Sequence, residues 1–235
     1  MLSSRARLQA RQGQDAPPRH EYLQQLVNEF QRSPDVLRQE EVVAHLANFA
    51  YDPINYTSFC ALRIMDLFLD ILAVASPGGS TDVNETHNDD SDVCGSARKG
   101  PSTTTSPRQL VQKRSLVEFA LGGICNCISD PQLQQQFIDG DGVELLVPFV
   151  LDIPPRDDDA TPFTRSELNV VVSSLTIAYF LLDSRAFAAI TSDPIVAKMR
   201  QLQQQQWPRQ SVVVVAQISN TAAAFLARYK ELLAV

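Results

Sequence analysis

The sequence predicts an all-α protein, a right-handed solenoid of about three to four helical repeats. Three observations favour this fold class: apolar residues recur at helical spacing, helix-start signals follow one another at short intervals, and one stretch of sequence returns twice. The 235 residues are 44% hydrophobic, which is enough to form a sizeable core. The low counts of glycine (9) and of aromatic residues (7%) disfavour a β-sandwich or barrel.

Capping residues mark the helix starts. One face of a first helix is lined, at spacing i, i+3, i+4, i+7, by Leu23, Leu26, Val27 and Phe30. Four further starts combine an N-cap residue with a following proline: Ser33–Pro34, Asp52–Pro53, Asp130–Pro131 and Asp193–Pro194. Capping-box spacing occurs twice, in Ser115 with Glu118 and in Thr164 with Glu167. A last helix over 212–233 is expected to form the terminal layer of the stack.

Three segments lack the apolar periodicity of a helix. Residues 1–19 carry four arginines and are expected to form a flexible basic arm. Residues 76–107 are rich in Ser, Thr, Gly, Asp and Asn, which predicts a disordered insertion. Residues 152–162 contain three acidic residues in a row and three prolines, and are expected to be a linker. The repeat domain therefore covers 20–235, interrupted twice.

The repeats themselves give the strongest signal. Leu46–Pro53 aligns without a gap on Ile124–Pro131, at an offset of 78 residues. A third copy lies 53 residues further on and is marked by Ile177, Asp183, Ile190, Val196 and Met199. When the insertion and the linker are left out, the offsets shrink to 46 and 42, the period of HEAT and armadillo units. Such units share one continuous core, because none can bury its apolar faces alone.

Specific motifs point to one of these repeat types. Leu46–Ala50 resembles the third helix of an armadillo repeat. Asp139–Val147 resembles the turn after the first helix of such a repeat, together with its second helix. Four blocks are similar, more specifically, to the armadillo repeat-containing protein 7 family: Tyr22–Gln31, His45–Tyr56, Met65–Asp70 and Leu116–Asn126. The resemblance is dense over 22–72 and 116–150 and fades beyond Asp152, and the insertion has no counterpart in that family.

The resemblance implies a function that composition and spacing do not. It implies a non-catalytic nuclear scaffold of the minor (U12-type) spliceosome, which pairs with an RNA-recognition-motif protein at the capped 5′ end of the U6-type small nuclear RNA. The alternative is a cytosolic armadillo adaptor that binds extended peptide segments in its concave groove. The first hypothesis implies other spliceosomal proteins as partners and the nucleus as the main compartment, with the cytoplasm as a second one.

Two groups of residues are candidates for partner binding. Asn48 and Asn126 occupy the armadillo position at which a carboxamide lines the groove and can pair with a peptide backbone, although each could equally tie its own turn. The second group surrounds a predicted helix junction: Tyr51, Asp52, Asn55 and Tyr56. Its alternative role is capping by Asp52 beside two half-buried tyrosines. The pair Gly122–Gly123 within a helix indicates close helix packing or approach by a partner backbone.

Enzyme sites find no support in the sequence. The three histidines are dispersed, and neither metal-ligand spacing nor a phosphate-binding glycine motif occurs. We therefore expect no catalytic residues, metal or cofactor. The four cysteines have no framework spacing. No run of apolar residues approaches the length of a membrane span, so no membrane partner is expected.

The charge is distributed unevenly along the chain. The net charge of −7 argues against a free-standing DNA or RNA binder. By segment, however, residues 1–19 carry +3, residues 20–193 carry −14 and residues 194–235 carry +4. The basic C-terminal residues are candidates for RNA proximity, or they simply keep the last layer soluble: Lys198, Arg200, Arg209, Arg228 and Lys230. RNA contact is thus expected only through a partner or through the basic ends.

Overall fold

The computed structural model describes residues 4, 6, 17–75, 107–154, 161–205, 207 and 210–234, with only the backbone for 107–114. Within these residues the secondary structure is entirely helical. The helices are α2 (Arg19–Arg32), α3 (Val36–Ala50), the 3-10 turn η1 (Pro53–Asn55), α4 (Tyr56–Ala61), α5 (Ile64–Ala75), α6 (Pro107–Cys127), α7 (Pro131–Asp139), α8 (Gly142–Leu151), α9 (Arg165–Leu181), α10 (Phe187–Ile190), α11 (Asp193–Gln204) and α12 (Val212–Leu233).

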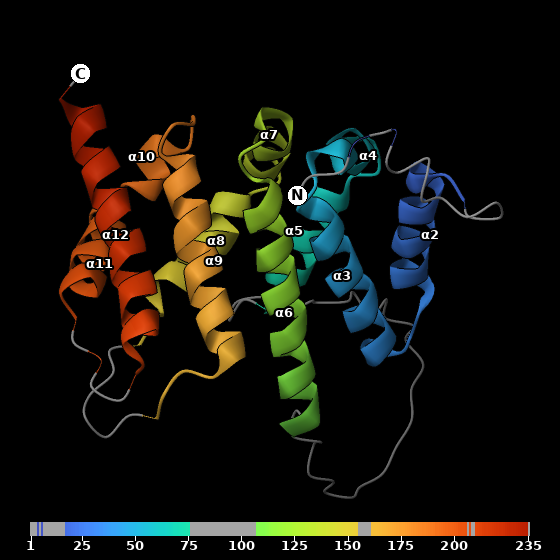
Figure 1. Ribbon diagram of the computed structural model, residues 1–235, viewed down its shortest axis with the longest axis horizontal. Coiled ribbons are helices and arrows are strands. Elements are labelled where there is room, and N and C mark those ends of the chain that lie inside the picture. The colour runs from blue at the N-terminus through green and yellow to red at the C-terminus, as the bar shows by residue number, and fades with distance from the viewer. Residues whose placement is uncertain are drawn as a thin grey trace, which may run out of the picture.

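The helices form an armadillo-like solenoid of four units. The first described unit is the pair α2 and α3, and each later unit has a short first helix followed by two longer ones. The last helices of the units, α3, α6, α9 and α12, pack side by side in chain order, and we call them the ladder helices (Figure 1). The middle helices α5, α8 and α11 lie behind them (Figure 1). The predicted all-α solenoid of three to four repeats is therefore confirmed.

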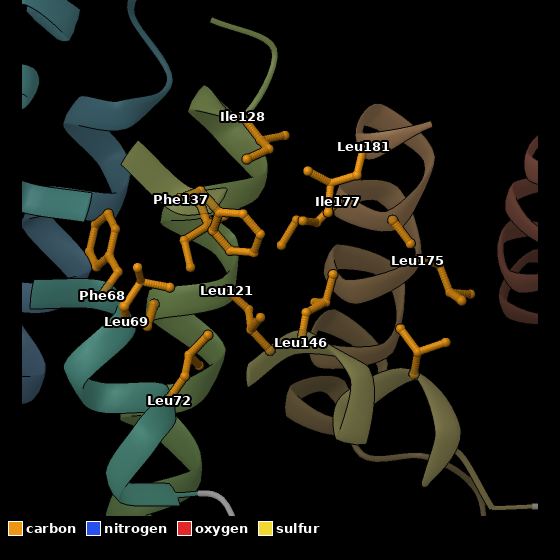
Figure 2. Close-up of a cluster of buried hydrophobic side chains, with 14 of the residues drawn as sticks. Phe68, Leu69, Leu72, Leu121, Ile128, Phe137, Leu146, Leu175, Ile177 and Leu181 are labelled. Carbon is orange, nitrogen blue, oxygen red and sulfur yellow. The ribbon is translucent and has the colours of Figure 1, made fainter. Parts of the chain in front are cut away.

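One hydrophobic core runs through all the units. Figure 2 shows buried side chains of several helices gathered in one cluster, among them Phe68 of α5, Leu121 of α6 and Phe137 of α7. Phe68, Phe137 and Leu121 are fully buried. Because removing a buried Phe side chain costs about 3–5 kcal/mol, these contacts hold each unit to its neighbour.

Equivalent positions of the repeats have equivalent structures. Asp52 and Asp130, aligned in the sequence, are both N-caps followed by a proline, and each side chain accepts hydrogen bonds from the first turn. Arg63 and Asp141 are separated by the same offset, and both adopt left-handed backbone angles, with φ of 54° and 57°. The third-copy markers Ile177, Ile190, Val196 and Met199 are all buried. The alignment of the repeats thus holds at the level of single residues.

Some predicted helix starts are wrong. Helix α3 is capped by Asp35, whose carboxylate accepts from the Leu37 N–H at 3.0 Å, and Ser33 ends α2 instead. The spacing of Ser115 and Glu118 marks no start, because α6 already begins at Pro107 and runs through both residues. Helix α11 begins at Asp193, with Ser192 as its N-cap residue. The predicted capping box of Thr164 and Glu167 is confirmed, with both hydrogen bonds present.

The predicted arm, insertion and linker lie mostly outside the described residues, and their described edges are ordered. Arg19 begins α2, and its guanidinium stacks 4.7 Å from the centre of the Phe49 ring. Pro107 belongs to α6. Ile153, at the start of the predicted linker, is only 2% exposed and belongs to the core.

The terminal helix α12 covers the last side of the solenoid. It buries Ile218, Ala222, Phe225 and Leu226 against the α9–α11 layer. By length and composition alone it is also the one described helix that is apolar enough to cross a membrane. Its start leaves Val212 84% exposed and Val213 69% exposed, so the outer side of the last layer carries apolar surface.

Candidate functional site

A groove lies across three ladder helices. It is a hollow of about 280 Å³ between α3, α6 and α9. Its walls combine small, apolar and amide side chains with one carboxylate: Ala44, Ala47, Asn48, Glu118, Phe119, Gly122, Asn126, Asn169, Val172 and Ser173. We call this hollow the groove. It contains both predicted asparagines, Asn48 and Asn126.

Asn126 ties the groove to the neighbouring helix. Its side-chain Nδ2 donates to the Ala47 carbonyl of α3 at 3.1 Å, and its own carbonyl accepts from the Tyr56 hydroxyl at 3.0 Å. The Asn126 side chain is nevertheless exposed in the groove. This residue therefore links two units and still presents its amide oxygen to a ligand.

Asn48 is the freer of the two asparagines. Its side chain is exposed in the groove and hydrogen-bonds to no other residue in the described part of the chain. A carboxamide offers two N–H donors and an acceptor, the groups that pair with an extended backbone. Asn48 is therefore available for a ligand without breaking any bond within the protein.

Two further polar residues of the groove were not predicted. On α9, the Asn169 Nδ2 donates to the Glu118 Oε1 of α6 at 2.6 Å. The repeat alignment places Tyr179 opposite Asn126, so the repeated position itself supplies no amide on α9. Asn169 supplies one from about three turns earlier. The sequence signal was only its place on the exposed face of a helix, which does not distinguish it from any surface asparagine.

The adjacent glycines Gly122 and Gly123 have different surroundings. A Cβ added at Gly123 would lie 2.5 Å from the Phe68 Cζ, so this glycine permits α5 to pack closely against α6. No heavy atom lies within 4 Å of a Cβ added at Gly122, which lines the groove. Close packing thus explains Gly123, whereas Gly122 leaves open space for a ligand.

The predicted aromatic–polar cluster divides into surface and interior residues. Tyr51, at the end of α3, is 62% exposed and can contact a partner. Asp52 is half-buried and caps η1 through the Ile54 N–H, at 3.3 Å. Tyr56 is half-buried, and burial raises the pKa of its hydroxyl. Asn55 is 1% exposed and donates to the Phe49 carbonyl, so its buried side chain does not fit the predicted contact with a partner.

The basic C-terminal residues do not form one free patch. The Lys198 Nζ donates to the Ile153 carbonyl, and burial lowers the pKa of this half-buried ammonium. Arg228 pairs with Asp183 at 2.5 Å and with Glu231 at 3.0 Å, and its hydrogen bond lowers the pKa of the Asp183 carboxyl. Arg200 and Lys230 are exposed, and Arg209 lies outside the described residues. Two of the four described cations are thus already engaged within the protein.

The described thiols are poor nucleophiles and metal ligands. Burial raises the pKa of Cys60, of Cys125 and, to about 12, of Cys127. Within the described residues no group of three or more His, Cys, Asp or Glu side chains could hold a metal ion. The groove, in contrast, offers amide and carboxylate side chains that can bind a ligand.

Comparison with known proteins reveals a local similarity. The chain is 54% identical over 52 residues to armadillo repeat-containing protein 7 of Mus musculus. The match covers 22% of this chain and 26% of the mouse protein, so it spans about a quarter of that relative's length. No protein-family model matches the chain. The local similarity to an armadillo-repeat protein agrees with the armadillo-like solenoid fold.

Proposed function

We propose that this protein is a non-catalytic scaffold that holds an extended segment of a partner protein in the groove. One observation carries the proposal: Asn48 and Asn126 lie on neighbouring ladder helices, and both are exposed in the same hollow. An extended segment has unpaired backbone N–H and C=O groups along its length. Carboxamides on successive ladder helices can hydrogen-bond those groups. These bonds would hold the segment across the helices whatever its sequence.

The groove residues also favour an extended occupant over a helix. A helical ligand satisfies its own backbone hydrogen bonds and needs a continuous apolar surface. Here the apolar lining is interrupted on each ladder helix by an amide: Asn48 on α3, Asn126 on α6 and Asn169 on α9.

A matched pair of substitutions tests the groove. Asn48→Ala should weaken capture of native partners at least about five-fold, since it removes amide hydrogen bonds worth about 1 kcal/mol or more. Thermal stability should stay unchanged, because the Asn48 side chain bonds to no other described residue. Asn220→Ala, on the exposed face of α12, is the control. Partner capture that is equal for the two variants in quantitative pulldowns would place the interface elsewhere.

We further propose that the partner is an RNA-recognition-motif protein of the minor spliceosome, held near the 5′ end of the U6-type small nuclear RNA. The support is the resemblance of the sequence blocks around Asn48 and Asn126 to the armadillo repeat-containing protein 7 family. The nucleus is the proposed compartment. The acidic body of the chain favours RNA contact through the partner, with Arg200 and Lys230 as the exposed cations of the basic end.

Crosslinking in cells tests this assignment. The tagged chain should co-purify with an RNA-recognition-motif protein and with U6-type RNA of the minor spliceosome, and both should be lost with Asn48→Ala. Arg200→Glu with Lys230→Glu should reduce direct RNA crosslinks while the protein partner stays bound. Recovery of cytosolic partners alone, without that RNA, would support the cytosolic adaptor instead.

A further inference from the structure

We propose that the groove selects a partner segment that carries a lysine or arginine, and that Glu118 is the specificity-determining residue. The inference rests on the proposed groove function and concerns which extended segment is bound. It follows from the charge, the hydrogen bonding and the free space around one carboxylate.

Among the side chains that the structure describes, Glu118 is the only charged one that lines the groove. It is half-buried, and it makes no ion pair in the part of the chain that the structure describes. A partly desolvated carboxylate binds an N–H donor of a cation more strongly than a neutral donor. A segment with an acidic side chain at this point would bring two like charges together and bind worse.

Asn169 holds the carboxylate in place. Its Nδ2 donates to Oε1 of Glu118 at 2.6 Å, and it bonds only one of the two oxygens. The other oxygen, Oε2, has no hydrogen-bond partner among the described residues. The pair links α6 to α9, so the free oxygen is presented from a fixed position on the wall of the groove.

The space beside Glu118 suits a long side chain. Gly122 lies one helical turn further along α6, and no atom stands within 4 Å of the position where its Cβ would be. Phe119 and Val172 add apolar surface to the same hollow. The aliphatic stem of a lysine or arginine can pack on such surface while its charged end reaches the carboxylate.

Peptide pools of defined composition test the selection. Each pool has about ten residues per peptide, drawn from Ala, Gly, Ser and Thr, with Lys, Arg, Leu or Glu fixed at the centre. In fluorescence anisotropy titrations the full chain should bind the Lys and Arg pools about five- to ten-fold tighter than the Leu pool, and the Glu pool weakest. Raising the salt concentration should reduce this preference.

Substitutions of Glu118 give the decisive comparison. Glu118→Gln keeps the shape and the acceptor for Asn169, and should bring the Lys and Leu pools to within about two-fold of each other. Glu118→Lys should favour the Glu pool. Asn169→Ala should lower the affinity for the Lys pool more than the affinity for the Leu pool, because it releases the carboxylate as well as removing a groove amide. Glu144→Gln, the same change on the exposed side of α8, should alter nothing.

The outcomes separate this inference from the function on which it rests. If all pools bind, and Glu118→Gln leaves their ranking unchanged, the selection by Glu118 is refuted and the groove function stands. If Asn48→Ala weakens every pool equally while Glu118→Gln removes only the preference, both are supported. If the wild-type chain binds no pool, the groove function fails and the inference fails with it.

Discussion

At the scale of single residues, two neighbouring glycines should respond in opposite ways to the same methyl group. In Gly123→Ala the new Cβ would meet the buried Phe68 ring, and we expect a loss of about 1–3 kcal/mol in the free energy of unfolding. In Gly122→Ala the Cβ enters open space and the helix gains up to about 1 kcal/mol. Urea unfolding of the two variants measures both, and equal effects would contradict the packing described for α5 and α6.

A buried thiol makes the stability depend on alkaline pH. Burial raises the pKa of Cys127 from 9.0 to about 12, and its Sγ donates to the Gly123 carbonyl. Below pH 9 the thiol is protonated in both states. Between pH 9 and 12 only the unfolded chain loses the proton, so the free energy of unfolding falls, by about 1.4 kcal/mol at pH 10.

The variant Cys127→Ala isolates this effect. It should be less stable than the wild type at pH 7, because it leaves a small cavity. Its free energy of unfolding should nevertheless fall less steeply from pH 8 to pH 10, as followed by denaturant titration at each pH. Parallel pH profiles for the two proteins would show that the thiol does not contribute.

At the scale of helices, Gln134 of α7 ties this helix to α9 of the same unit and to the turn that follows α6. The Gln134 Nε2 donates to the Phe180 carbonyl of α9 at 3.1 Å and to the Ile128 carbonyl at 3.4 Å. Gln135 instead bonds to Asp139 within α7. We expect Gln134→Ala to cost about 1–2 kcal/mol and Gln135→Ala less than about 0.5 kcal/mol, in thermal or urea unfolding. Similar losses for both would mean that the bonds of Gln134 do not stabilise the packing of α7.

The sequence predicted the helices well wherever a cap and a repeat agreed. Asp52, Asp130 and Thr164 are caps in the structure, because each precedes an apolar helical pattern that the other copies share. Ser115 carried the spacing of a capping box within a longer helix. Local hydrogen bonding favours a start there, but α6 continues through it from Pro107.

The groove was predictable only in part. That Asn48 and Asn126 line the groove follows from their position in the repeat, because this position determines which face of the ladder helix carries the side chain. Glu118 and Asn169 meet because α6 and α9 bring side chains 51 residues apart within 2.6 Å, a contact that depends on how two helices pack. The burial of Asn55 depends on the turn after α3, where its side chain donates to the Phe49 carbonyl, and a polar residue type does not predict it.

At the scale of the whole molecule, stability should depend little on the segment between α5 and α6. Both helices contact each other and the next unit directly. Replacing residues 76–106 with a Gly–Ser linker of about 12 residues should raise the free energy of unfolding by about 0.8 kcal/mol through a smaller loop-closure entropy. Denaturant unfolding measures the change, and peptide titrations should show an unchanged groove. A large loss of stability would instead assign that segment a structural role.

The ladder helices have a further consequence, because α3, α6, α9 and α12 all run in the same direction (Figure 1). Their peptide dipoles add, with the amide ends along one edge of the solenoid and the carbonyl ends along the other. Asp52 and Asp130 follow the carbonyl ends of α3 and α6, so they add negative charge at that edge, whereas Asp183 after α9 is paired with Arg228. The two edges of the groove, which the ladder helices line, therefore differ in local potential, and a charged segment that approaches in dilute salt is oriented before it makes contact.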